Sequence, residues 1–548
     1  VRRPDARARP VCPRSRTVIV PPQAPAAGTV LPLVGRLAAT VDPLALYRTL
    51  ADGGERPHTF LLESADGSER QGQRSLIGVR AAARIAADLE SVRIEPLSPN
   101  GAAIAALVAA HHPTASTDGN VLVVPIAPVP ARIDERERFR HGTAFDVLRT
   151  LTFGIALAAT PNPWGHLLVG AFGYDAIDYF ERLPLGYADP LAQPVLEFWI
   201  PDRLIVVDHP TASATVVATA WGGTGFDARY HDASRAVEQL VAALTSVGTA
   251  QHRDERGSPD AALADVSVDQ SDDEFARTVA GLQQHILAGD VYQIVPSRTF
   301  SLPCPDPLAA YGELRARNPS PYLFYLRGPE RALFGASPET SLRIDAATRT
   351  ATITPIAGTV GRGRDARGAL DLEADARAEV MLRLDGKELA EHLMLVDLAR
   401  NDIARISTPG TRAVTRLLEV ERYTHVMHLV SEVSGRLAPH TDALEAYAAT
   451  MNMGTLVGAP KVRAAELLRH SEVSRRGSYG GSVGYLRSDG TLETAIVIRS
   501  AVVVDGIAHV RAGAGVVMDS DPAAEALETR RKARAVVEPI RHAEAPAH

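Results

Sequence analysis

The clearest indication of fold class is a series of hairpin sequences near the C-terminus. Two turn sequences, SDG and DG, separate three segments of strand character, 481–486, 493–504 and 507–512. Aspartate followed by glycine favours the tight turns that join antiparallel strands, because glycine readily takes the positive φ that these turns need. A helix is expected directly afterwards, with Pro522 in its first turn. Antiparallel strands followed by a helix predict an α+β fold and argue against a doubly wound parallel sheet.

Domain organisation is predicted from length and from one polar stretch. The chain has 548 residues, more than one ordinary core holds. Between Thr249 and Asp272 the sequence is polar and interrupted by glycine and proline, which is typical of a linker. We therefore predict four parts: a disordered, basic and proline-rich tail at 1–28, an N-terminal domain at 29–250, a linker at 251–272 and a C-terminal domain at 273–548.

Composition argues against several classes of function. The formal net charge of −7 gives no reason to expect nucleic acid or an anionic membrane as a partner. Cys12 and Cys304 stand alone, which argues against a disulfide framework, a zinc site or a thiol nucleophile. No apolar run approaches the ~18 residues that span a bilayer, and the N-terminal stretch lacks the apolar core of a secretory signal. We expect a cytoplasmic protein.

Acidic residues recur on two predicted helices. The segment KELAEHLMLVDLARND holds Glu388 and Glu391, and the C-terminal helix places Glu525, Glu528 and Lys532 on one face. Two glutamates from different helices suit Mg²⁺, which takes one or two carboxylates and keeps positions open for substrate oxygens. Solvated helix faces with i,i+4 ion pairs are the alternative interpretation.

Glycine-rich segments form a second pattern, PIAGT, GAPK, YGGSVG and RAGAGVV. Small residues let the backbone approach a ligand closely. Beside Arg499 and Lys532 such backbone would form a cradle for carboxylates, and Lys461, at a predicted helix start, would also favour anions. Tight turns and bulges are the alternative explanation of the glycines. His428 is open to two interpretations, a catalytic group or a hydrogen-bonded core residue.

A series of longer motifs, in order along the chain, resembles the chorismate-utilizing enzymes and, within them, the large subunit of anthranilate synthase. The resemblance extends from about Leu31 to Ile540 and rests on GDVYQIVPS, NPSPYLFYL, FGASPET, ITPIAGT, KELAEHLMLVDLARND, RYTHVMHLVSEVSGRL, GTLVGAPKVRA, RRGSYGGSVGYL and AGAGVVMDSDP followed by ETRRKARA. It implies antiparallel β-sheets packed as a sandwich with flanking helices, and a chorismate-binding catalytic domain at 273–548. The implied activity is a Mg²⁺-dependent lyase that converts chorismate and ammonia to anthranilate and pyruvate in tryptophan biosynthesis or a secondary pathway.

The resemblance also assigns roles to individual positions. Glu391 and Glu528 correspond to the Mg²⁺ ligands, and Glu339 to the general acid that protonates the departing ring hydroxyl. His428, and not His425, corresponds to the histidine linked to pyruvate elimination. The catalytic set is completed by Thr359 and Gln293. The implied substrate-binding residues are Tyr479, Arg499, Ala512, Gly513, Ala514, Gly515, Lys532, Thr455, Ala357 and Gly358.

Two positions separate the sister activities of the family. Isochorismate and salicylate synthases carry a water-activating lysine where this chain has Gln293, and aminodeoxychorismate synthases carry a lysine where it has Ala357. Direct attack by ammonia on the chorismate ring is therefore the route that the resemblance implies for this chain. No amidotransferase nucleophile motif occurs, so a separate glutamine amidotransferase subunit is expected to supply ammonia in a hetero-oligomer. The departures at Val360, Gly361 and Val457 keep open an aminodeoxyisochorismate synthase, which aminates without eliminating pyruvate. A non-catalytic regulatory subunit is the alternative of a different class.

A tryptophan feedback pocket is also implied by the resemblance. Its residues would lie partly in the N-terminal domain and partly in the catalytic domain: Leu62, Glu63, Ser64, Arg74, Pro321, Tyr322, Leu323, Val483 and Tyr485. Leu323 replaces a common methionine, and Arg74 stands where relatives carry lysine. L-Tryptophan is accordingly expected as an effector that favours a conformation of low substrate affinity.

Overall fold

The computed structural model describes residues 22–64, 73–127, 130, 133–140, 142–158, 162–184, 188–246, 266–365, 368–423 and 426–544. Most of the predicted tail and of the predicted linker lies outside these ranges, as does His425. The division into domains therefore stays a prediction. Strands from both sides of the predicted linker nevertheless pair directly: β2 (Thr59–Glu63) pairs with β14 (Tyr322–Arg327), and β8 (Leu167–Phe172) pairs with β22 (Ser482–Arg487).

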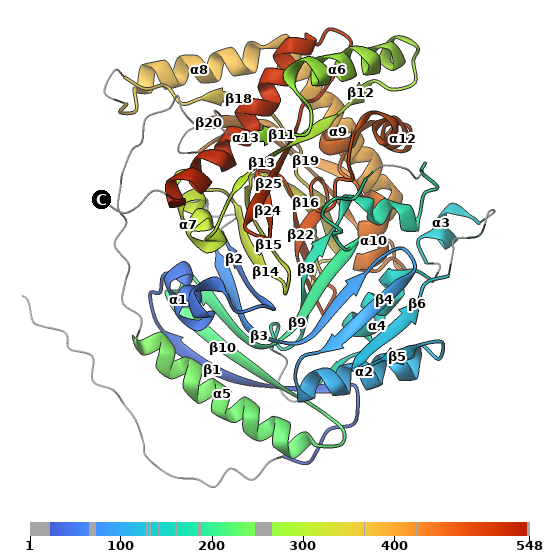
Figure 1. Ribbon diagram of the computed structural model, residues 1–548, viewed down its shortest axis with the longest axis vertical. Coiled ribbons are helices and arrows are strands. Elements are labelled where there is room, and N and C mark those ends of the chain that lie inside the picture. The colour runs from blue at the N-terminus through green and yellow to red at the C-terminus, as the bar shows by residue number, and fades with distance from the viewer. Residues whose placement is uncertain are drawn as a thin grey trace, which may run out of the picture.

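The strands form two layers that share two long strands (Figure 1). One layer runs in the order β1 (Thr29–Ala38), β10 (Ser213–Trp221), β9 (Leu196–Asp208), β3 (Arg74–Ala87), β2 (Thr59–Glu63), β14 (Tyr322–Arg327), β15 (Arg331–Ser337), β24 (Ser500–Val504), β25 (Ile507–Gly513), β13 (Ser297–Pro303) and β11 (Ser267–Val268). We call it the first layer.

The second layer contains the other ends of β3 and β9. It runs in the order β5 (Ser116–Asp118), β6 (Val121–Pro125), β4 (Ser91–Pro96), β3, β9, β8 (Leu167–Phe172), β22 (Ser482–Arg487), β23 (Leu492–Ile496), β16 (Thr340–Asp345), β17 (Thr350–Ile353) and β20 (Val426–Arg436). β18 (Ile356–Gly361) and β19 (Ala413–Arg422) also pair with β20. Outside this layer, β7 (Ala156–Leu157) pairs with β1, and β12 (Gln293–Ile294) pairs with β21 (Gly458–Ala459).

The two layers face each other across an apolar core. Register shifts between Gly78 and Ala83 bend the β3–β9 pair, which lets the same strands enter both layers. Phe60 and Val502 from the first layer pack with Val169 and Val483 from the second. Burying each such side chain contributes roughly 1.5–3 kcal/mol. The predicted α+β fold, with antiparallel sheets packed as a sandwich, is confirmed.

Helices cover the outer faces of both layers (Figure 1). The first layer packs against α1 (Pro43–Leu50), α5 (Phe226–Ser246), α7 (Pro307–Arg317) and α13 (Pro522–Glu544). The second packs against α2 (Pro99–His111), α4 (Ala144–Phe153), α9 (Gly386–Ile406) and α10 (Ala443–Thr450). The remaining helices are η1 (Asp52–Gly54), α3 (Glu135–Arg138), η2 (Tyr174–Tyr179), α6 (Asp272–Leu287), α8 (Leu372–Leu384), α11 (Gly454–Val457) and α12 (Lys461–Ser471).

The C-terminal hairpins are present, with one correction. The segment 493–504 is not one strand but two, β23 and β24, because Arg499 between them has a φ of +49°. A positive φ takes the backbone out of the extended conformation and ends the strand. The break points the second half of the segment into the first layer, where β24 pairs with β15.

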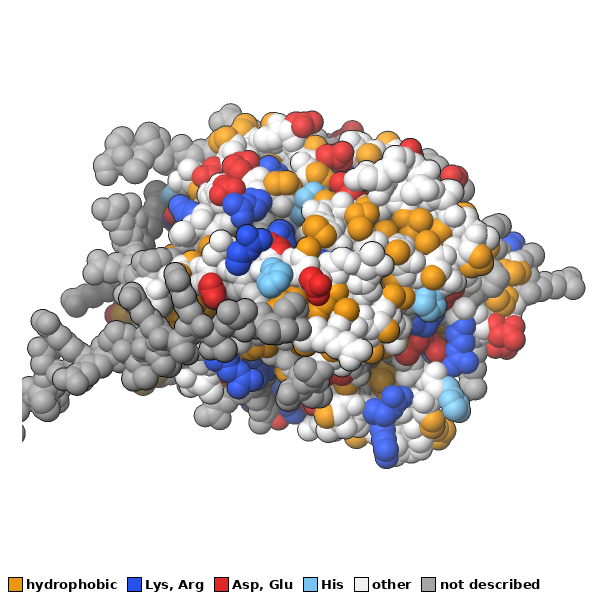
Figure 2. Space-filling view, turned by 90° about the horizontal axis from the view of Figure 1, so that it is seen from below, with side chains coloured by type: hydrophobic (Ala, Val, Ile, Leu, Met, Phe, Trp, Pro, Cys, Tyr) orange, Lys and Arg blue, Asp and Glu red, His pale blue; other side chains and the backbone are white. Residues whose placement is uncertain are grey.

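The charge on the surface and the composition of the helices are relevant to binding of charged partners and of membranes. Acidic and basic side chains are interspersed on the face seen in Figure 2. None of the helices formed by the described residues combines the length and the apolar character that crossing a bilayer requires.

Candidate active site and effector cavity

His428 and Thr359 face each other across neighbouring strands. They are register partners in β20 and β18, and Thr359 Oγ1 lies 2.9 Å from His428 Nδ1. The strand bulges at Gly358, whose φ of +78° suits glycine, and Ala357 pairs with Leu429 on the other side of the bulge. Burial, reinforced by the charge of Arg499, lowers the pKa of His428 to about 4. The imidazole is therefore neutral at pH 7 and able to accept a proton.

The pKa of Glu339 is raised, whereas that of His428 is lowered. Its side chain is buried between β15 and β16, and burial raises the pKa of its carboxyl to about 8 although Thr455 and Lys532 favour the ionised form. The group is therefore protonated at neutral pH and able to donate a proton. One neutral base and one protonated acid are the pair expected for a reaction that needs proton transfer in both directions.

The helices α9 and α13 bring the carboxylates of Glu388, Glu525 and Glu528 within electrostatic range of Glu391. Burial raises the pKa of Glu391 most strongly, Lys387 opposes that rise, and the charges of Glu388, Glu528 and Glu525 add to it. Lys387 Nζ, 3.8 Å from Glu391 Oε1, offsets part of the repulsion between these like charges, and a bound metal cation would offset it further. Sequence reasoning chose Glu391 and Glu528 and passed over the other two as metal ligands, although their i,i+3 spacing is visible in the sequence.

The donor set at this site fits Mg²⁺. Two carboxylates from different helices leave positions open for water and for a substrate oxygen, which is the coordination that Mg²⁺ favours. Glu528 also forms an ion pair with Lys532, whose Nζ lies 2.6 Å from Glu528 Oε1. Among the described residues no group of three or more histidine, cysteine, aspartate or glutamate side chains is arranged to hold a metal ion by itself. Substrate oxygens would thus have to complete the coordination.

The predicted carboxylate cradle surrounds Gly513. Lys532 Nζ donates to the carbonyl oxygen of Gly513 at 3.0 Å. A Cβ atom at Gly513 would lie 3.0 Å from the Tyr479 hydroxyl, so only glycine lets these groups approach. Burial lowers the pKa of Arg499, which Tyr479 and Glu528 oppose through their charges. The arrangement brings together Lys532 from α13, Arg499 from the β23–β24 break and the hydroxyl of Tyr479 from the segment before β22, beside Gly513 at the end of β25.

The adjoining backbone differs in detail from the prediction. The N–H of Ala514 donates to Pro296 O at 3.1 Å, and Ala512 pairs with Arg298 in the β13–β25 ladder. Ala514 therefore contributes the shape of the cradle and not an unused donor. A Cβ atom at Gly515 would lie 2.8 Å from Gln293 Nε2. Gln293 Oε1 is buried and accepts no hydrogen bond from the described residues. Buried polar atoms normally have a hydrogen-bond partner, so this oxygen is suited to accept one from a polar ligand.

The suggestion that Lys461 binds an anion is wrong. Its Nζ donates to Asp402 Oδ2 and to Thr450 O, each at 2.7 Å, and the group is buried. Its charge is thus already neutralised by Asp402 on α9, and the residue ties α12 to α9. The helix-start position was the misleading signal, because a lysine there serves an internal carboxylate equally well.

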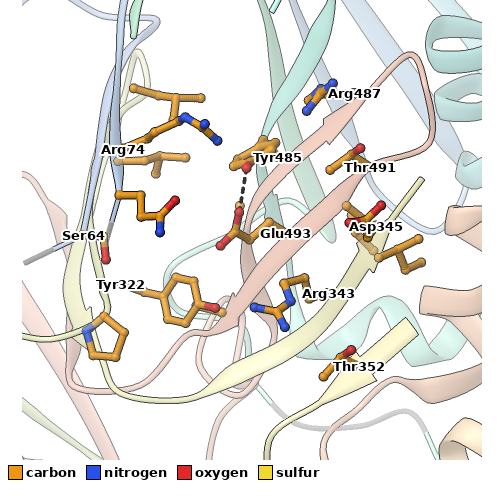
Figure 3. A pocket seen from close by; sticks show the side chains of 18 of the residues that line it. Ser64, Arg74, Tyr322, Arg343, Asp345, Thr352, Tyr485, Arg487, Thr491 and Glu493 are labelled. Atoms are coloured by element: carbon orange, nitrogen blue, oxygen red, sulfur yellow. Dashed lines mark hydrogen bonds between the residues drawn. The ribbon is translucent and has the colours of Figure 1, made fainter. Parts of the chain in front are cut away.

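A cavity of about 750 Å³ holds all nine residues predicted for the effector (Figure 3). They come from β2 and the residue after it, β3, the β14 region and β22. The Tyr485 hydroxyl donates to Glu493 at 2.6 Å inside the cavity. Glu63 instead directs its carboxylate at α7, where it accepts from the Tyr311 hydroxyl at 2.6 Å. Arg74 is half exposed and pairs with Asp208, with Nε 3.1 Å from Oδ2.

Comparison with known proteins identifies the family to which the chain belongs. A sequence profile of the family described as chorismate binding enzyme matches residues 103–538. The chain belongs to this family. It is 46% identical over 505 residues to anthranilate synthase component 1 of Salmonella typhimurium, covering 91% of this chain and 94% of that protein. It is 45% identical over 513 residues to the pyocyanine-specific anthranilate synthase component 1 of Pseudomonas aeruginosa, covering 92% and 93%.

Solved structures agree with the fold of the family. Anthranilate synthase component I of Streptococcus pneumoniae matches with a TM-score of 0.65 at 28% identity, covering 85% of this chain and 92% of that chain. The menaquinone-specific isochorismate synthase of Escherichia coli also matches with a TM-score of 0.65, covering 95% and 96%, but at 17% identity it bears on the fold alone. The predicted family membership is confirmed.

Proposed function

We propose that this chain is the chorismate-binding component of an anthranilate synthase. It converts chorismate and ammonia to anthranilate, pyruvate and water. Relatives of that name share 45–46% identity over more than nine-tenths of the chain. The observation that carries the proposal is the buried carboxyl of Glu339, whose pKa of about 8 keeps it protonated at neutral pH within electrostatic range of Lys532 in the predicted cradle.

The residues act in two stages. In the first, Arg499, Tyr479 and Lys532 hold the two substrate carboxylates. Glu339 gives its proton to the ring hydroxyl, which leaves as water while ammonia forms the new carbon–nitrogen bond. Gln293 and Ala357 supply no lysine that would activate water or attack the ring instead.

In the second stage the ring becomes aromatic. His428, held by Thr359, takes a proton from the ring carbon that bears the new amine while the bond between the ring and the enolpyruvyl oxygen breaks. That proton passes to the methylene carbon of the departing group, which becomes pyruvate. Mg²⁺ held by Glu391 and Glu528 would neutralise the ring carboxylate and draw electrons from the ring. The acidic cluster on α9 and α13 supports this assignment.

Ammonia comes from a separate glutamine amidotransferase subunit in this proposal. The relatives are named as component 1, which implies a second component. The chain's own sequence holds no amidotransferase nucleophile motif. Addition of the amidotransferase subunit should allow glutamine to replace ammonium as the nitrogen source. Failure of every glutaminase tested to support glutamine-dependent turnover, while ammonium still worked, would count against this partnership.

L-Tryptophan is the proposed effector, bound in the 750 Å³ cavity. Pockets of this size accept a drug-sized molecule, and Leu323 and Val483 give it an apolar wall. We expect tryptophan to raise the KM for chorismate, because it favours a conformation with low substrate affinity. Unchanged chorismate turnover at millimolar tryptophan would refute this effector.

The deciding experiment for the function is product identification. Purified chain is incubated with chorismate, Mg²⁺ and ammonium at alkaline pH, and the product is identified by mass and by fluorescence. Anthranilate fluoresces, whereas aminodeoxyisochorismate, the product of the alternative enzyme, does not. A non-aromatic amine would establish that alternative, and no turnover with well-folded protein would favour a regulatory subunit.

A further inference from the structure

Glu339 is held in a short turn between two strands. The turn runs from Ser337, the last residue of β15, to Thr340, the first residue of β16. The Glu339 N–H donates to Ser337 Oγ at 3.3 Å, and the Glu339 carbonyl accepts from the N–H of Ile496 at 3.0 Å. The position of the carboxyl therefore depends on how firmly both ends of this turn are held.

Tyr322 holds both ends. Its backbone is the register partner of Ser337 in the β14–β15 pair. Its hydroxyl lies 2.9 Å from Thr340 Oγ1, where either atom can donate. Burial raises the pKa of Tyr322, so the phenol stays protonated and able to donate. The backbone and the side chain of one residue thus contact the two ends of the turn that carries the acid.

The same side chain is part of the cavity wall. Tyr322 lines the 750 Å³ cavity, and Figure 3 shows its ring extending among the lining residues. Ala495, which also lines the cavity, is the register partner of Thr340 in the β16–β23 pair. A ligand that repacks this wall must therefore move groups that hold the turn, because close-packed interiors transmit displacement from neighbour to neighbour.

We propose that Tyr322 is a positioning residue that fixes Glu339 through its hydrogen bond to Thr340, and that this bond transmits the occupancy of the cavity to the acid. The inference rests on the proposed function, in which Glu339 donates the proton. Proton donation is sensitive to displacements of a fraction of an ångström, so a loosened turn lowers the rate without removing a substrate contact.

Three threonine variants test the positioning role in the whole chain. Thr340→Val removes the hydroxyl and nearly keeps the shape, Thr340→Ser keeps the hydroxyl, and Thr350→Val makes the same change elsewhere in the cavity wall on β17. We expect Thr340→Val to lower kcat about five-fold, as for loss of one uncharged hydrogen bond, with the KM for chorismate within about two-fold. Thr340→Ser should restore kcat, and Thr350→Val should not change it. Circular dichroism melts establish that each variant is folded.

Tryptophan tests the transmission. Thr340→Val should still bind tryptophan in equilibrium dialysis but should be inhibited at least about three-fold less than the wild type at equal occupancy. A Thr340→Val enzyme with wild-type kcat and wild-type inhibition overturns the inference while the proposed function stands. A wild type that is active but not inhibited overturns the transmission. A folded wild type that forms no product from chorismate overturns both the function and the role of Tyr322.

Discussion

Replacing Glu339 by glutamine should stabilise the protein increasingly as the pH rises. The carboxyl has a pKa of about 8 in the folded chain against 4.5 as its ordinary value, and burial is the main cause. Between these two values the unfolded chain ionises while the folded chain keeps the proton, so the folded state loses stability with rising pH. Each pH unit corresponds to about 1.4 kcal/mol. The wild-type penalty therefore grows from near zero below pH 4.5 to roughly 5 kcal/mol above pH 8.

The assay is urea unfolding of the wild type and Glu339→Gln at several pH values from 5 to 8.5. The difference in unfolding free energy should rise with pH in favour of the variant, and Glu330→Gln, at an exposed position, should show no such trend. Turnover should fall by roughly 10²–10⁴-fold in Glu339→Gln, which is the range for loss of a general acid. A stability difference that stays constant from pH 5 to 8.5 would refute the buried, protonated carboxyl on which the mechanism depends.

Three further predictions follow from particular contacts. Glu528→Gln should raise the Mg²⁺ concentration for half-maximal turnover at least about ten-fold, measured by metal titration, and an unaltered titration would contradict the ligand assignment. Gly513→Ala should raise the KM for chorismate, because its Cβ would lie 2.7 Å from Pro296 O and 3.0 Å from the Tyr479 hydroxyl; steady-state kinetics with wild-type KM would show that the cradle is elsewhere. Lys461→Met should destabilise the chain by about 3–5 kcal/mol in urea unfolding, since it leaves Asp402 buried without its partner; a change below about 1 kcal/mol would mean that the pair is not needed.

Local patterns predicted the parts of the fold that local interactions determine. The SDG and DG turns correctly predicted the C-terminal hairpins, which are the β22–β23 and β24–β25 pairs. The helix predicted after these hairpins, with Pro522 in its first turn, is α13, which begins at Pro522. The break at Arg499 was missed because its positive φ depends on the packing of two layers, and arginine has no intrinsic preference for that conformation.

Long-range contacts limited what the sequence could reveal about the site. Helical spacing placed Glu525 and Glu528 on one face, but only the fold brings α13 beside Glu391 on α9. Lys461 was misread because its partner, Asp402, lies 59 positions away. The residues of the proposed effector cavity were predicted through family resemblance alone, since they come from both halves of the chain without a shared local pattern. The hydrogen bond between Tyr322 and Thr340 could not be predicted from the sequence, because tyrosine and threonine are common in strands and their presence does not indicate which residues they contact.

The most direct test of the account is the stoichiometry of the reaction with isotope-labelled ammonium. Chorismate and Mg²⁺ are supplied without glutamine, and labelled anthranilate and pyruvate are measured in the same sample by mass spectrometry and a coupled dehydrogenase assay. The mechanism predicts labelled anthranilate and unlabelled pyruvate in a one-to-one ratio, with both formed roughly 10²–10⁴-fold more slowly by Glu339→Gln. A labelled amine that keeps its enolpyruvyl group, with no pyruvate released, would contradict it.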